Sequence, residues 1–105
     1  MLYGLQQTTI EAINSVFRKY QDIDEVILYG SRAKGNFRTG SDIDLVLKGE
    51  KLSLSDLLKI ENELDDLMLP YKIDLALYHQ VNNPELIEHI ERVGISWDIN
   101  ISCNS

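Results

Sequence analysis

Apolar residues along the chain recur with two different periods, which predict an alternation of helices and strands. Residues 8–20 carry apolar side chains every three to four positions and predict an amphipathic helix, with Thr8 and Glu11 as its capping box. Residues 25–29 form a short apolar run rich in strand formers and predict a first strand. Residues 30–40 hold three glycines with polar and basic side chains and predict a loop, with room for one helical turn.

A second strand and a long helix are predicted next. Residues 42–48 alternate, so that Asp42, Asp44 and Val46 share one face of the strand. A helix follows, capped by Ser53 or Ser55 and continuing to residue 68, where Pro70 ends it. Its predicted apolar stripe consists of Leu54, Leu57, Leu58, Leu64, Leu67 and Met68.

The last third of the chain predicts one more strand and helix. Residues 72–78 alternate again, with Asp74 and Ala76 on the face opposite the apolar side chains. Asn83 before Pro84 predicts a helix start, and Gly94 predicts its end. Residues 95–99 predict a short edge strand. This order favours an α/β (α+β) fold, a small mixed sheet of three to four strands flanked by helices.

Length and composition narrow the class of protein. The 105 residues predict one domain spanning 1–105, with a polar tail at about 100–105. With 17 acidic and 10 basic residues, the net charge of −7 argues against general nucleic-acid binding. No apolar run approaches the roughly 20 residues that span a membrane, and no secretory signal is visible. A single cysteine, Cys103, cannot form an internal disulfide, so we expect a cytoplasmic location.

Three acidic residues are candidate metal ligands. Asp42 and Asp44 point to one side of their strand, and Asp74 joins them if the third strand is adjacent. Converging carboxylates raise one another's pKa, and a divalent cation removes that penalty. Mg²⁺ prefers such oxygen ligands, and two ions about 3.5–4 Å apart can clamp both oxygens of a displacement at phosphorus. Asp42, Asp44 and Asp74 are therefore predicted as catalytic and metal-binding residues.

The glycine-containing loop between the first two strands is a candidate phosphate site. Gly30 allows the backbone to approach a phosphate closely, and Ser31 adds a hydroxyl donor. Arg32, Lys34 and Arg38 concentrate positive charge beside it in an otherwise acidic chain. This charge suits the terminal phosphates of a nucleotide, which must be neutralised as the leaving group departs.

Two segments carry a recognisable signature: LYGSRAKG at 28–35 and RTGSDIDL at 38–45. They closely resemble the signature of the DNA polymerase β-like nucleotidyltransferase superfamily. Within it, the chain is similar to the minimal nucleotidyltransferases, short domains often paired as antitoxins with a small helical HEPN protein. The resemblance covers about residues 9–95.

The resemblance implies roles for particular residues. Asp42 and Asp44 would hold two Mg²⁺ ions, while Asp74 would bind the catalytic metal and help to deprotonate the acceptor hydroxyl. The nucleotide-binding residues would be Gly30, Ser31, Arg32, Lys34, Arg38 and Ser41. The implied reaction moves AMP from ATP onto a hydroxyl of a partner protein, a tyrosine of a HEPN toxin.

Two other functions remain open at this point. The same chemistry serves aminoglycoside-type enzymes that modify small molecules, although those usually carry an additional domain. The chain could instead be a non-catalytic, nucleotide-binding antitoxin that neutralises its partner by forming a complex.

Other chemically notable residues are not assigned to the site. His89 falls on the polar face of its predicted helix and is expected in solvent. His79 follows the strand that carries Asp74 and has room to approach the acids, but it is not predicted to do so. Trp97 is expected in the core or at an interface.

Overall fold

The structure, a computed structural model, describes residues 4–35 and 42–99. Helices and strands alternate along the chain, as the apolar periods predict. In chain order they are α1 (Gln7–Phe17), β1 (Glu25–Tyr29), α2 (Ser31–Lys34), β2 (Ile43–Lys48), α3 (Leu54–Asp65), β3 (Ile73–Leu77), the 3-10 helix η1 (Tyr78–Gln80), α4 (Pro84–Val93) and β4 (Ile95–Trp97).

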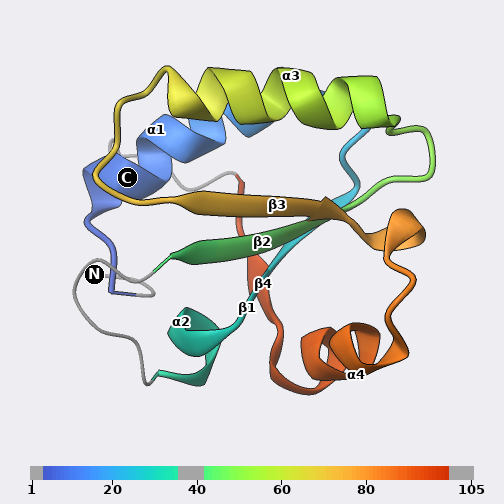
Figure 1. The fold of residues 1–105 in the computed structure, drawn as a ribbon. Helices are drawn as coiled ribbons and strands as arrows, with labels where there is room; N and C mark the ends of the chain where they lie inside the picture. The colour runs from blue at the N-terminus through green and yellow to red at the C-terminus, as the bar shows by residue number, and fades with distance from the viewer. Residues whose placement is uncertain (1–3, 36–41, 100–105) are drawn as a thin grey trace.

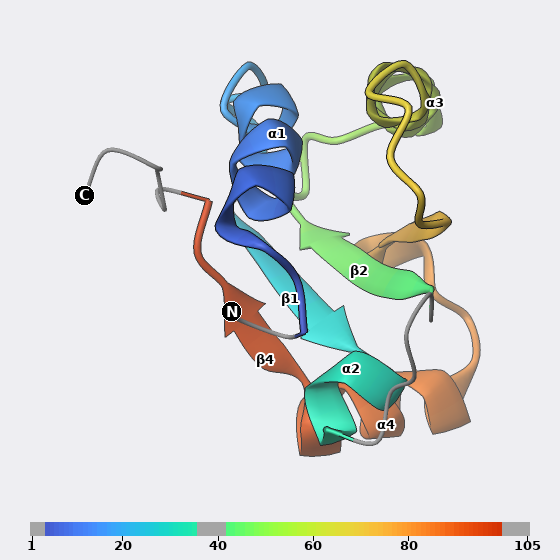
Figure 2. The same cartoon turned by 90° about the vertical axis from the view of Figure 1, so that its left-hand side faces the viewer.

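The strands form a mixed sheet in the order β3-β2-β1-β4. Strand β1 is antiparallel to β2 and β4, while β2 and β3 are parallel. Helices α1 and α3 cover one face of the sheet, and α2 and α4 lie on the other (Figures 1 and 2). The predicted fold class is therefore confirmed. No helix in the described part of the chain is both long and apolar enough to span a membrane.

The main core lies between the sheet and helices α1 and α3. Fully buried side chains include Ile13 and Phe17 from α1, Leu28 from β1 and Leu45 from β2. Each contributes about 1.5–3 kcal/mol by leaving water. Val46 is also fully buried, but outside this cluster, on the face that α4 covers. Both faces of β2 are thus fixed by packing, which holds the register of the strand.

Both predicted ends of the first helix are wrong. Helix α1 begins at Gln7 after Gln6, which makes no side-chain cap, so Thr8 lies inside the first turn and the predicted capping box does not form. Glu11 instead pairs with Arg18 at 3.2 Å. Helix α1 also stops at Phe17, three residues before the predicted end.

Helix α3 starts as predicted but ends early. Ser53 forms a capping box with Asp56. The helix ends at Asp65, and the chain then turns through Met68, whose φ of 56° is incompatible with the helix. Leu54 and Leu58 are more than half exposed and Met68 is 87% exposed, so the predicted stripe was partly wrong. The residues of α3 that are buried against the core are Leu57, Ile60 and Leu64.

The C-terminal elements agree with the sequence analysis. Asn83 caps α4 by accepting hydrogen bonds from the amides of Glu85 and Leu86, and Pro84 opens the helix. Gly94 follows as the C-cap. Edge strand β4 pairs with β1, and Trp97 is 2% exposed in the core, as expected. The predicted polar tail lies outside the described residues.

Candidate active site

Three strands bring Tyr29, Asp44 and Asp74 side by side at one end of the sheet. Asp44 on β2 is the register partner of both Tyr29 on β1 and Asp74 on β3. Register partners lie about 5 Å apart and project from the same face. Tyr29 contacts His89 of α4, so this is the face on which α2 and α4 lie (Figure 2). The expected adjacency of the second and third strands is confirmed, and we call these three residues the acid row.

The acid row is electrostatically strained without a counter-charge. Burial raises the pKa of the Asp44 carboxyl, and the charges of Asp74 and Asp42 and a hydrogen bond with Asp74 raise it further. His89 acts in the opposite direction and lowers it. Because burial and like charges disfavour the ionised form, Asp44 holds a proton more tightly than an isolated aspartate would.

Gly30 packs directly against Asp44. Its backbone, at φ 78° and ψ −155°, occupies a region that is essentially restricted to glycine. A Cβ at this position would collide with Oδ2 of Asp44 and would lie 3.2 Å from its Cγ. The chain enters α2 at the next residue, Ser31. The turn at Gly30 therefore lies in direct contact with the Asp44 side chain of the acid row.

The predicted basic residues are placed in different surroundings. Arg32 is 3% exposed, and its guanidinium lies over the ring of Tyr71, 5.1 Å from the centroid. This contact ties α2 to the segment that leads into β3. Lys34 is exposed at the end of α2. Arg38 and the predicted nucleotide-binding Ser41 lie outside the described residues.

The third acid lies close to the row but not within it. Asp42 is exposed, comes just before β2, and acts on Asp44 through its charge. Across residues 4–35 and 42–99, no three His, Cys, Asp or Glu side chains are already gathered closely enough to hold a metal ion. The adjacent carboxylates of Asp44 and Asp74 nevertheless fit a divalent cation, because its charge would replace their mutual repulsion.

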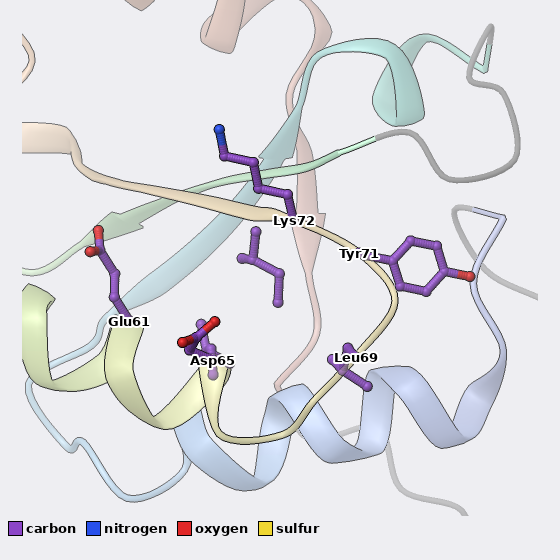
Figure 3. Close-up of a pocket in the computed structure, with 7 residues that line it drawn as sticks. Glu61, Asp65, Leu69, Tyr71 and Lys72 are labelled. Carbon is purple, nitrogen blue, oxygen red and sulfur yellow. The ribbon is translucent and has the colours of Figure 1, made fainter.

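A small hollow lies on the other side of β3, under α3. Its volume is about 130 Å³, and Figure 3 shows Glu61 and Asp65 of α3 facing it. Lys72 extends away from these carboxylates (Figure 3). Ligand pockets usually have volumes of about 300–1,000 Å³, so this hollow is too small for a nucleotide.

The structure overturns the expectation for His89. His89, expected in solvent, is half-buried and meets the Tyr29 ring edge to face, with centroids 6.2 Å apart. His79 Nε2 lies 3.0 Å from the carbonyl oxygen of Leu52. The available signal was helical spacing, because residue 89 lies three positions after Leu86 and four before Val93, on the flank of the apolar stripe.

Comparison with known proteins agrees with this geometry. Residues 11–96 match the family described as polymerase beta, nucleotidyltransferase. No curated protein matches the chain at a significant level. One chain of a crystal structure described as a toxin-antitoxin with AMP-PNP is similar in fold, with a TM-score of 0.70 and 18% identity over 90% of this chain and 73% of that chain.

Two further solved structures have related folds. A chain from a tri-AMPylated Shewanella oneidensis HEPN toxin in complex with an MNT antitoxin gives a TM-score of 0.66 and 17% identity, covering 90% of this chain and 72% of that one. A putative nucleotidyltransferase from Sulfolobus solfataricus gives 0.52 and 16%, covering 86% and 77%. At these identities, the likenesses show the fold alone.

The family match spans the Gly30 turn and all three acids. It also covers most of the chain, from within α1 to within β4. The chain therefore belongs to the polymerase β nucleotidyltransferase family.

Proposed function

We propose that this chain transfers AMP from ATP to a hydroxyl group of a partner protein, and that it is the antitoxin of a HEPN toxin-antitoxin pair. The packing of Gly30 against Asp44 within the acid row is the observation that carries the proposal. This packing places a backbone turn that can approach a phosphate beside carboxylates that can hold cations. The fold likeness to chains from toxin-antitoxin complexes, one with AMP-PNP, supports the choice of substrate and partner.

The residues divide the chemistry between them. Asp44 and Asp74, with Asp42 beside them, would hold Mg²⁺, which supplies charge neutralisation of the phosphates when it is bound. Gly30 and Ser31 would bind the phosphates, with Lys34 and Arg38 adding positive charge nearby. Arg32 would steady this turn through its contact with Tyr71.

The transfer balances as a single displacement. The acceptor oxygen forms a bond to the α-phosphorus, the bond to the bridging oxygen of the β-phosphate breaks, and pyrophosphate leaves. Asp74 lies at the end of the row on strand β3 and is exposed, so it can accept the hydroxyl proton.

The test is to incubate the purified chain with Mg²⁺, α-labelled ATP and lysate of the source organism. We expect a labelled protein band with the wild type and none with Asp44→Asn. The matched control is Asp65→Asn, which removes an exposed carboxylate from α3 and should label the band normally. Label on a small molecule would favour the aminoglycoside-type alternative. Binding of ATP without any transfer would favour the non-catalytic antitoxin.

A further inference from the structure

Helix α4 brings a histidine to the acid row from outside the signature motif. The ring of His89 meets that of Tyr29 with an interplanar angle of 83°, a favourable edge-to-face geometry. Tyr29 is in turn the register partner of Asp44 and the neighbour of Gly30. A continuous path of contacts thus leads from α4 to the residue at the centre of the row.

Close packing of α4 on β1 fixes where His89 lies. At Gly94, which ends the helix, a Cβ would collide with the carbonyl oxygen of Ile90 and lie 2.7 Å from Cγ2 of Ile27. Ile90, next to His89 in sequence, is 2% exposed. Because such close packing resists sliding or rolling of α4 on the sheet, it holds the imidazole ring of His89 in contact with Tyr29.

The charges near Tyr29 and Asp44 agree with this arrangement of register partner and ring contact. The pKa of the Tyr29 phenol is raised by burial first, and then by the charges of Asp44 and Asp74. His89 lowers the pKa of Asp44 and so favours its ionised form. Tyr29 lies directly opposite Asp44 on the neighbouring strand, so movement of its ring would change the space available to the Asp44 carboxylate.

We infer that His89 is a positioning residue of the acid site, and that its ring contact holds Tyr29 as the wall that limits where Asp44 points. The inference rests on the proposed function for the role of Asp44, and it applies to any acceptor. Losing the contact is expected to weaken metal binding by about two- to tenfold, the size of effect that an aromatic pair contact gives. The KM for ATP should stay near the wild-type value, because the glycine turn is untouched.

The experiment measures Mn²⁺ affinity of the ATP-free chain by electron paramagnetic resonance, alongside the kinetics of AMP transfer. His89→Ala and His89→Gln remove the ring, whereas His89→Phe keeps a ring edge without imidazole chemistry. Glu88→Ala is the matched control, because Glu88 is an exposed neighbour on the same helix. Thermal melting of each variant reports any loss of stability separately.

We expect lower Mn²⁺ affinity and kcat for the alanine and glutamine variants, and near-wild-type values for His89→Phe and the control. Wild-type affinity in the alanine and glutamine variants would overturn the inference, even if those variants melted at lower temperature. A His89→Phe variant as impaired as His89→Ala would overturn the ring-contact explanation. If the wild type binds Mn²⁺ but transfers no AMP, the proposed function fails while the affinity series still decides this inference.

Discussion

Replacing Gly30 by alanine is the sharpest test of the contact between the Gly30 turn and the Asp44 side chain. The backbone conformation of Gly30 costs a non-glycine residue about 1–3 kcal/mol. The added Cβ also collides with Oδ2 of Asp44, and displacing that side chain from its rotamer costs about 0.5–1.5 kcal/mol more. We therefore expect a loss of about 2–4 kcal/mol, which for a domain of this size lowers the Tm by roughly 10–25 °C.

The matched control is Gly35→Ala. Gly35 also has a positive φ, 84°, but among the residues that the structure describes its Cβ would meet no atom within 4 Å. Left-handed strain alone costs about 1–2 kcal/mol, so this variant should lose less stability and keep its transfer activity. Calorimetry and the AMP-transfer assay compare the two. Equal melting temperatures for Gly30→Ala and Gly35→Ala, or full activity in Gly30→Ala, would refute the claim that Gly30 packs tightly against Asp44 in the active site.

Further predictions concern charge and the buried polar contacts. In chelator, Asp44→Asn should melt above wild type by a margin that grows as pH rises through the raised Asp44 pKa, because folding disfavours the ionised form; a lower Tm in calorimetry would contradict this. A hydrogen bond to Glu63 is the largest of the causes that raise the pKa of Tyr20 to about 12. The folded state should therefore lose stability between about pH 10 and 12, and Tyr20→Phe should abolish this loss in urea titrations. Asn14→Ala removes the oxygen that accepts the Trp97 Nε1 hydrogen bond at 2.7 Å and should cost about 1–3 kcal/mol, as measured by urea unfolding.

The acid row could be predicted because it depends on local rules. The alternation of side chains along β2 and β3 placed Asp44 and Asp74 on the face of each strand opposite its large apolar side chains. The structure confirms that these two strands are neighbours. The sequence could not supply the register, which decides that Asp44 lies opposite Asp74 and Tyr29. That register follows from burial on both faces of β2, a long-range property.

Features that depend on contacts between distant segments escaped prediction. Arg32 was predicted to face a nucleotide beside the turn, but its guanidinium lies over the ring of Tyr71, a residue far along the chain. His89 looked solvent-exposed because its helix neighbours are charged, whereas the roll of α4 on β1 turns its ring to Tyr29. A local feature also escaped prediction: α3 ends at Asp65 before the positive φ at Met68, which no apolar period reveals.

The most direct test of the central claim uses a purified HEPN partner and ATP labelled at either the α- or the γ-phosphate. We predict label on the partner from α-labelled ATP only, with transfer lost in Asp44→Asn and Asp74→Asn and retained in Asp65→Asn. Transfer of the γ-label, or undiminished α-label transfer in the two acid-row variants, would contradict nucleotidyl transfer at this site.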